Sequence, residues 1–329
     1  MSTTKVITVT LTPSLDRTLV TSYLAVGYHN LTQETTRLDP AGQGVNITRA
    51  LYRLNVPTHG IVLVGDDATG RAYQALIQEE YFEATTIRVQ GRTRSNTIIL
   101  DTGNETETQI IEESGEISDK DLTHIETAVN NLILPGDIVV LAGPLPNGVS
   151  ADTYQRLTMI ARQAGAEVAA VIAGEPLQHA LYAQPELVAL TQNEMEAFFN
   201  YPVRAPEDVL GSARKLCQEG ASKVLVILEG DGAVVMVSTE DAWLVELPTP
   251  EKGTTSGVWD ALIAGFVMSR LEKRSDREAL QMGAGAAAFT ASQVGSEFGS
   301  PEQMLAYLDQ ISVEDANGLV AQAGTGLAE

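Results

Sequence analysis

The sequence predicts an α/β fold, with a doubly wound, mainly parallel sheet, helices on both faces and a small β-sheet lid. From residue 119 onward, helical and strand patterns alternate regularly, which is typical of a parallel sheet. Residues 138–142 are apolar at every position, so both faces of this strand must be covered by helices. Two stretches, residues 16–38 and 92–112, are polar and rich in Thr, which favours a small exposed sheet inserted into the main domain.

The first third of the chain supplies strands and helices of the main domain and the strands of the lid. We expect strands at residues 5–11 and 60–64 and helices at residues 45–54 and 69–80. Residues 85–89, 97–101 and 107–111 read as strands of a second exposed piece.

The rest of the chain alternates between the two kinds of element. We expect helices at residues 119–132, 151–164 and 206–219, with a short one near residue 178, and strands at residues 138–142, 167–172, 187–190, 223–228, 233–237 and 242–246. Three further helices start near residues 257, 276 and 301. We therefore predict one domain over residues 1–315, with lid insertions at about 16–38 and 92–112. Residues 316–329 are rich in Ala and Gly and are predicted to form a disordered tail.

Composition limits the classes of partner. The formal net charge of −22 argues against nucleic acid or an anionic membrane as a partner. We find no apolar run of membrane-spanning length and no basic-then-apolar export signal. A single cysteine, Cys217, excludes a disulfide framework and a Cys-based metal site. The four scattered histidines show no metal-ligand spacing. We expect a cytoplasmic protein.

The most informative stretch is residues 253–266, Gly-Thr-Thr-Ser-Gly-Val-Trp-Asp-Ala-Leu-Ile-Ala-Gly-Phe, a Gly-containing turn that leads into an apolar helix. The unpaired N–H groups and the dipole at such a helix start favour an anion, most often phosphate. Asp260 in the first turn is placed to take a proton from an attacking hydroxyl. The alternative is that Ser256 or Asp260 only caps the helix.

A second Gly-rich turn, residues 40–46 (Pro-Ala-Gly-Gln-Gly-Val-Asn), also leads into a helix. Its glycines let the backbone approach a ligand closely, and Asn46 can hydrogen-bond a hydroxyl. Asp16, just after the first strand, is a second carboxylate suited to sugar hydroxyls. The alternative is an ordinary helix entry with an Asn in its first turn.

Four motifs in this order resemble one family. They are Thr12-Pro13-Ser14-Leu15-Asp16, Ala41-Gly42-Gln43-Gly44-Val45-Asn46, Asn193-Glu194-Met195-Glu196 and Gly257-Val258-Trp259-Asp260. Together they resemble the ribokinase-like (PfkB) sugar kinases, especially the branch that phosphorylates fructose 1-phosphate or tagatose 6-phosphate. Supporting matches are Thr93-Arg94-Ser95-Asn96 and residues 143–149, Gly-Pro-Leu-Pro-Asn-Gly-Val. The resemblance covers about residues 5–312.

The resemblance implies roles for individual residues. Asp260 would be the general base, and the turn at Gly257 would form an anion hole for the transferred phosphoryl. The sugar would be held by Asp16, Gly42, Gln43, Gly44 and Asn46, with Arg94 as the cation for an existing phosphate. The cofactors would be ATP and Mg²⁺, bound by Asn193, Glu196, Glu229, Gly232, Gly257 and Trp259, with Glu196 reaching the metal through water. The alternatives are a solvated surface Arg94 and an ordinary helix-face Glu196.

The phosphate-site motifs also depart from the family pattern. Where relatives read Gly-Ala-Gly-Asp, this chain has Val258 and Trp259, and a Trp side chain there points away, stacks on a ligand or fills the phosphate's space. Gln43 replaces a lysine, and the loss of a charge-assisted contact costs about 1.5–3 kcal/mol of binding. Glu229 adds a negative charge near the expected triphosphate, and residues 171–174, Val-Ile-Ala-Gly, replace Asp-Thr-Ser-Gly.

These observations give two functional hypotheses. The first is an ATP- and Mg²⁺-dependent carbohydrate kinase, of altered or impaired activity, that moves the γ-phosphoryl to a hydroxyl of a sugar or sugar phosphate. The second is a catalytically degenerate relative that binds a sugar phosphate or nucleotide as a sensor or partner subunit. The resemblance further implies a homodimer through the lid. A third Gly-rich run, residues 283–288, lies inside a helical pattern and is read as helix packing, not as a dinucleotide fingerprint.

Overall fold

The computed structural model describes residues 4–32, 37–228, 232–248, 256–293 and 296–318. A ten-stranded sheet forms its centre, in the order β14-β13-β12-β11-β10-β9-β8-β1-β4-β5. Its strands are β1 (Val6–Thr10), β4 (Thr58–Gly65), β5 (Glu83–Val89), β8 (Ile138–Ala142), β9 (Glu167–Val171), β10 (Leu187–Thr191), β11 (Lys223–Ile227), β12 (Ala233–Ser238), β13 (Ala242–Glu246) and β14 (Val313–Asp315). The strands from β11 to β5 are parallel, and β12, β13 and β14 extend the sheet in antiparallel pairs.

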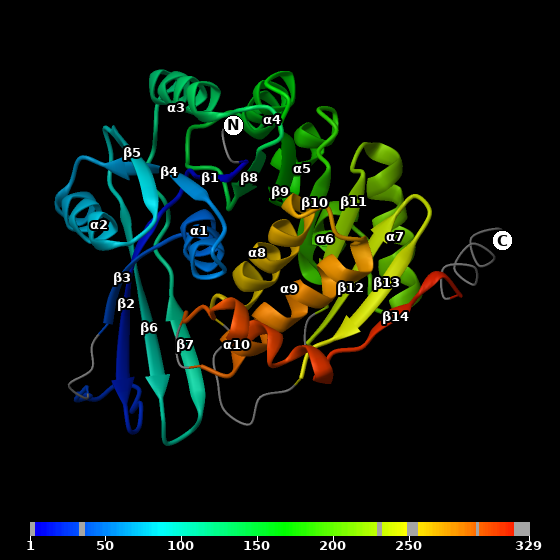
Figure 1. The fold of residues 1–329 in the computed structure, drawn as a ribbon. Helices are drawn as coiled ribbons and strands as arrows, with labels where there is room; N and C mark the ends of the chain where they lie inside the picture. The colour runs from blue at the N-terminus through cyan, green and yellow to red at the C-terminus, as the bar shows by residue number, and fades with distance from the viewer. Residues whose placement is uncertain (1–3, 33–36, 229–231, 249–255, 294–295, 319–329) are drawn as a thin grey trace.

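Helices cover both faces of this sheet, as predicted (Figure 1). One face carries α1 (Gln43–Arg53), α2 (Ala68–Glu79), α8 (Val258–Leu271), α9 (Asp276–Ala291) and α10 (Pro301–Leu305). The other carries α3 (Asp119–Leu132), α4 (Thr153–Gln163), α5 (Gly174–Leu181), α6 (Gln192–Phe199) and α7 (Pro206–Glu219). Strand β8 is buried at all five positions, and its side chains alternate between the two core clusters. This two-sided burial explains its continuous apolar run.

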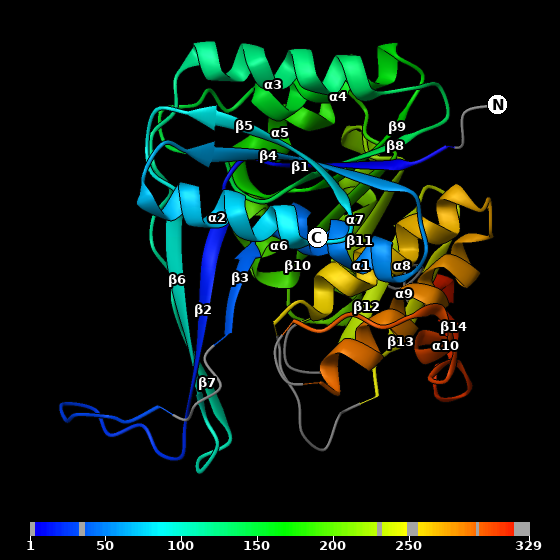
Figure 2. The same cartoon turned by 60° about the vertical axis from the view of Figure 1, so that its left-hand side comes forward.

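A separate four-stranded sheet forms the predicted lid, in the order β3-β2-β6-β7. Its strands are β2 (Ser14–Thr21), β3 (Arg37–Ala41), β6 (Arg94–Asp101) and β7 (Thr106–Ile110). Figure 2 shows this small sheet starting near the carboxyl ends of β4 and β5 and extending away from the large sheet. Since β2 follows β1 after only a short turn, the small sheet stands at the edge where the parallel strands end.

One strand was wrongly assigned from the sequence. Residues 85–89 were expected in the lid, but they belong to β5, which pairs in parallel with β4 at the edge of the large sheet. An edge strand has a neighbour on one side only, and most positions of β5 are half-buried or exposed. Its Thr-rich, alternating pattern therefore resembles that of a lid strand. The short α6 and β14 also had no counterpart among the expected elements.

The Gly-Ala run at residues 283–288 lies inside α9, as predicted, and brings α9 close to α8. A Cβ added at Gly283 would lie 2.7 Å from the carbonyl oxygen of Leu262, and one added at Gly265 would lie 2.8 Å from that of Met282. Neither helix could carry a side chain at these positions without moving apart. The two helices thus pack backbone to backbone, which fixes where the first turn of α8 lies.

Within the described part of the chain, no helix combines the length and the apolar character needed to cross a bilayer. The cytoplasmic location remains a prediction, as do the domain boundary at residue 315 and the tail. Residues 316–318 are described, and the remainder of the predicted tail, residues 319–329, lies outside the described residues.

We predict that Gly42→Ala destabilises the protein. Gly42 precedes α1 with φ 123° and ψ 143°, and a Cβ there would lie 2.8 Å from Cγ2 of Thr10 and 3.0 Å from Cα of Pro13. The backbone conformation alone costs a non-glycine residue about 1–3 kcal/mol. Gly211→Ala, inside α7 with nothing within 4 Å, is the control and should stabilise by roughly 0.5–1 kcal/mol. Urea unfolding measures both, and a Gly42→Ala protein as stable as wild type would contradict this account.

Candidate active site

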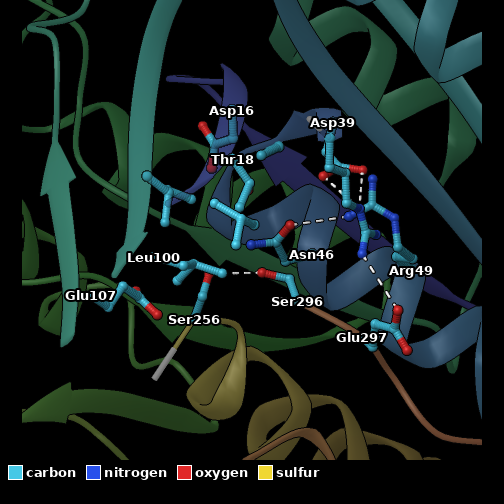
Figure 3. A pocket seen from close by; sticks show the side chains of 14 residues that line it. Asp16, Thr18, Asp39, Asn46, Arg49, Leu100, Glu107, Ser256, Ser296 and Glu297 are labelled. Atoms are coloured by element: carbon cyan, nitrogen blue, oxygen red, sulfur yellow. Dashed lines mark hydrogen bonds and ion pairs between the residues drawn. The ribbon is translucent and has the colours of Figure 1, made fainter. Parts of the chain in front are cut away.

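A cavity of about 270 Å³ lies between the small sheet and the first turns of α1 and α8 (Figure 3). Its lining residues are Asp16, Thr18, Val20, Arg37, Asp39, Ala41, Asn46, Arg49, Ile98, Leu100, Glu107, Ser256, Ser296 and Glu297. The small sheet contributes one wall, since the alternate residues of β2 and β6 point the same way. The small sheet therefore supplies most of the lining residues, and the main domain supplies the rest.

The start of α8 depends on a glycine. Gly257, the residue before the helix, has φ 76°, a left-handed conformation that favours glycine. A Cβ there would lie 3.1 Å from Cζ of Phe298 and from Cβ of Ser296. The neighbouring Ser256 and Ser296 share a hydrogen bond of 2.7 Å between their hydroxyl oxygens. The turn is thus held against the segment that follows α9, with Asp260 in the first helical turn.

The start of α1 is pressed against β1 by two glycines. A Cβ added at Gly44 would lie 2.3 Å from Oγ1 of Thr10 and 3.1 Å from the carbonyl oxygen of Val9, and Gly42 is equally close to β1. Their closeness to β1 is thus sufficient structural reason for both glycines. It also places Asn46, in the first turn of α1, opposite the first turn of α8.

Asn46 and Asp260 meet at this junction, although 214 positions separate them in the chain. Nδ2 of Asn46 donates a hydrogen bond of 2.8 Å to Oδ2 of Asp260. Asp260 is only 8% exposed. Burial raises the pKa of its carboxyl to about 7, against the lowering effects of the Asn46 hydrogen bond and the Arg49 charge, while the Asp16 charge raises it further. A carboxyl with a pKa near 7 is suited to accept a proton at neutral pH.

Asp16 lines the same cavity from β2, where its Oδ1 accepts a hydrogen bond of 2.9 Å from Nδ2 of Asn96. Burial raises the pKa of Asp16, while hydrogen bonds from Ser14 and Asn96 and the charge of Arg94 lower it. The structure thus places Asp16 and Asn46, both singled out from the sequence, in the wall of one cavity. Asp260 is not among the described lining residues and is joined to the cavity wall through its hydrogen bond with Asn46.

Arg94 and Gln43 are not among the described lining residues of this cavity, and Arg94 lines a separate, smaller cavity together with Thr12 and Pro13. Arg94 begins β6 next to Ser14, and its Nη2 donates to the carbonyl oxygen of Thr12 at 3.3 Å. Its Nε is buried and has no hydrogen-bond partner among the described residues. Burial lowers the pKa of the guanidinium, and the charge of Asp16 raises it. Gln43 is the first residue of α1 and lies near Gly143.

The residues expected to bind nucleotide lie at the carboxyl ends of neighbouring strands. Asn193 and Glu196 are on α6, directly after β10, and Gly232 precedes β12 with φ 63°. Oε2 of Glu196 accepts the backbone N–H of Val203 at 3.1 Å. Glu229 lies outside the described residues, as does the turn at residues 249–255.

Trp259 is half-buried and packs against the apolar cluster between the sheet and α8 and α9. Among the described residues that line the cavity, its indole is not present. Whether Trp259 points away, stacks on a ligand or fills the space of the phosphate stays a prediction.

Metal ligands can also be tested against the described residues. Among them, no three His, Cys, Asp or Glu side chains lie close enough together to hold a metal ion directly. Mg²⁺ is commonly bound by one or two carboxylates together with water and substrate phosphates. A single half-buried carboxylate such as Glu196 is sufficient for a Mg²⁺ ion that is bound mainly by water and substrate phosphates.

Comparison with known proteins agrees with this geometry. The profile of the "pfkB family carbohydrate kinase" matches residues 9–303. This chain belongs to the pfkB family of carbohydrate kinases.

Two relatives of this pfkB-family chain cover almost its whole length. A 1-phosphofructokinase of Bacillus subtilis (strain 168) is 31% identical over 306 residues, covering 93% of this chain and 98% of the relative. The ATP-dependent 6-phosphofructokinase isozyme 2 of Escherichia coli (strain K12) is 25% identical, with coverages of 93% and 99%.

Solved structures share the fold of this pfkB-family protein. The phosphofructokinase-2 of Escherichia coli, crystallised in complex with substrates and products, aligns with a TM-score of 0.85 at 25% identity, over 93% of this chain and 99% of that chain. An Arabidopsis thaliana ribokinase, complexed with ribose and ATP, aligns with a TM-score of 0.70 at 20% identity, over 93% and 99%. The second likeness confirms the predicted ribokinase-like fold.

Several residues of the cavity were missed from the sequence. Arg49 is three positions after Asn46 on the same helix, a spacing that could have identified it. Arg37, Asp39, Glu107, Ser296 and Glu297 belong to no motif, and only the fold brings them together. Arg37 pairs with Asp39 at 2.7 Å and approaches Glu297 at 3.7 Å, so it bridges the lid and the main domain.

The raised pKa of Asp260 predicts a pH-dependent cost to stability. The carboxyl loses its proton near pH 3.8 when unfolded but keeps it up to about pH 7 when folded. Unfolding therefore releases a proton within this window, and stability falls as pH rises, by up to about 1.4 kcal/mol per pH unit. Asp260→Asn removes this effect. Its unfolding free energy, relative to wild type, should increase from about pH 4 to about pH 7 and then level off.

Urea unfolding at a series of pH values measures this difference. Asp309→Asn, at an exposed position that does not line the cavity, is the matched control and should lack the rise expected of Asp260→Asn. A difference between Asp260→Asn and wild type that stays constant across the same pH range would contradict the burial-induced shift.

Proposed function

We propose that this protein is an ATP- and Mg²⁺-dependent kinase that phosphorylates a hydroxyl of a sugar phosphate of the fructose phosphate type, with Asp260 as the general base. One observation carries the proposal. The buried Asp260 carboxyl accepts a hydrogen bond from Asn46, which lines a cavity of about 270 Å³, and its pKa of about 7 suits proton transfer. Membership of the pfkB family gives the reaction class.

The proposed reaction is an in-line displacement. The acceptor hydroxyl gives its proton to Asp260, and its oxygen forms a bond to the γ-phosphorus of ATP. The bond from that phosphorus to the bridging β–γ oxygen breaks, and ADP leaves. The first-turn N–H groups of α8, beginning at Gly257, favour the negative charge on the transferring group.

The acceptor is proposed to lie against β2 and α1. Asp16 and Asn46 offer a carboxylate and an amide to its hydroxyls, with the backbone of Gly42, Gln43 and Gly44 beside them. Of the charged residues that line the cavity, Asp16, Asp39, Glu107 and Glu297 are acidic, and Arg37 and Arg49 are already paired. We therefore assign the phosphate of the acceptor to Arg94, whose buried Nε lacks a partner among the described residues. The name of the Bacillus subtilis relative favours a fructose phosphate as the acceptor.

ATP is proposed to lie across the carboxyl ends of β10 and β11, between α6 and the start of α8. Asn193, Gly232, Gly257 and Trp259 border this position, and the name of the Escherichia coli relative supports ATP as the donor. Glu196 would hold Mg²⁺ through water. When bound, the metal neutralises charge on the phosphates.

An assay of ADP release tests the proposal. With MgATP and fructose 1-phosphate, fructose 6-phosphate, tagatose 6-phosphate or fructose in turn, wild type should turn over at least one phosphorylated acceptor. Asp260→Asn should lower kcat by about 10²–10⁴-fold, because it removes the base and keeps the shape of the side chain. Asp309→Asn should leave kcat unchanged.

Failure to release ADP with every acceptor, together with retained binding of a sugar phosphate or ATP by calorimetry, would contradict the kinase proposal. That result would favour the degenerate sensor or partner subunit considered above. Turnover that survives in Asp260→Asn would contradict the assignment of the base.

We further propose a homodimer through the small sheet. The segment that follows β2 exposes large apolar side chains, with Tyr28 80% and Leu31 90% exposed. Sedimentation velocity should show a dimer for wild type and a monomer for the double variant Tyr28→Asp/Leu31→Asp. Tyr182→Asp, which removes an exposed tyrosine next to α5, should remain dimeric. A wild-type monomer at micromolar concentration would contradict the proposal.

A further inference from the structure

Arg49 connects three parts of the cavity wall. It lies in α1, one turn after Asn46, and its side chain is 11% exposed. Nε and Nη2 donate to Oε1 of Glu80 at 3.0 and 2.6 Å, and Nη2 also donates to the carbonyl oxygen of Pro40 at 2.7 Å. Glu80 follows the last turn of α2, and Pro40 lies in β3. The guanidinium is therefore fixed from outside the reaction site.

The remaining nitrogen of Arg49 acts on Asn46. Nη1 donates to Oδ1 of Asn46 at 3.2 Å. An amide has an acceptor end and a donor end, so this contact leaves the donor end, Nδ2, for Oδ2 of Asp260 at 2.8 Å. A flipped amide would set donor against donor at Arg49 and acceptor against acceptor at Asp260. Arg49 thereby determines that the donor end of the Asn46 amide, and not its acceptor end, contacts the carboxylate of Asp260.

Arg49 also acts on Asp260 through its charge. Among the described residues, two charged groups affect the carboxyl: Arg49 from α1, which lowers its pKa, and Asp16 from β2, which raises it. Burial raises the pKa more than either of them changes it. On the side of α8 and the segment after α9, Ser256 and Ser296 are hydrogen-bonded to each other. The ionised form is therefore favoured by two groups, the Asn46 amide that donates to the carboxyl and the Arg49 cation that orients this amide.

We propose that Arg49, held by Glu80, is a positioning residue for phosphoryl transfer. It locks the amide of Asn46 in the orientation that donates to Asp260, and it favours the carboxylate that accepts the proton. The inference rests on the proposed function, in which Asp260 is the base. The alternative is that Arg49 merely ties α1 to α2 and β3, which would affect stability alone.

A set of four variants separates the two. Arg49→Met removes the charge and the amide contact, and Arg49→Lys keeps the charge but loses the fork. Glu80→Gln weakens the anchor. Arg71→Met, at an exposed position of α2, is the control for loss of one positive charge. The readout is the pH dependence of kcat/KM with MgATP and fructose 1-phosphate, with circular dichroism to confirm folding.

In Arg49→Met we expect the acidic limb of the profile to move upward by about one pH unit and kcat at neutral pH to fall at least tenfold. In Arg49→Lys the limb should move less, although kcat still falls. Glu80→Gln should shift in the same direction by a smaller amount, and Arg71→Met should match wild type. A folded Arg49→Met whose acidic limb coincides with that of wild type would overturn the inference. If Arg49→Met does not fold, Arg49→Lys and Glu80→Gln carry the test, and unchanged profiles in both would overturn it.

A second measurement does not depend on turnover. The carboxyl ¹³C resonance of Asp260, assigned by its absence in Asp260→Asn, reports the titration of this group without substrate. Its midpoint should rise in Arg49→Met and stay unchanged in Arg71→Met. An unchanged midpoint in Arg49→Met would overturn the inference even in an active enzyme. A raised midpoint in a protein that turns over no acceptor would refute the proposed function and leave the effect of Arg49 on Asp260 in place.

Discussion

The hydrogen bond between Asn46 and Asp260 is the contact on which the rest of the site depends. It joins the first turns of α1 and α8, of which α1 follows β3 of the small sheet and α8 follows β13 of the large sheet. Both turns start at a glycine with positive φ. A Cβ at Gly42 would collide with Thr10, and one at Gly257 would lie 3.1 Å from the side chains of Phe298 and Ser296. The starts of both helices are thus packed closely against their neighbours.

This arrangement has a cost. A carboxyl that is 8% exposed and accepts a hydrogen bond only from a neutral amide among the described residues is less easily ionised than one in water. The protein offsets the cost in part with Arg49, which is itself fixed by Glu80 and Pro40. The result is a carboxyl with a pKa of about 7, bonded to Asn46 in the wall of a cavity between the small sheet and the starts of α1 and α8. A group that destabilises the folded chain in this way is typical of a functional site and has no structural benefit.

The sequence predicted the fold well, because the alternation of apolar strands and helices follows directly from burial on both faces of β8 and its neighbours. It failed at β5, where an edge position produces the same polar alternation as a lid strand. For the site, Asp16, Asn46 and Asp260 were found because each follows a recognisable turn. Ser296 and Glu297 could not be found, since they lie in an irregular segment that only the packing of α8 on α9 brings to the cavity. Roles at Glu229 remain predictions, because it lies outside the described residues.

The most direct test is a crystal structure of the protein with fructose 1-phosphate and a non-hydrolysable ATP analogue with Mg²⁺. An acceptor hydroxyl should lie within about 3 Å of a carboxylate oxygen of Asp260, on the line to the γ-phosphorus, with Asn46 still donating to that carboxylate. An acceptor bound elsewhere, or one whose hydroxyls all stay out of hydrogen-bonding reach of Asp260, would contradict the assignment of this junction as the catalytic centre.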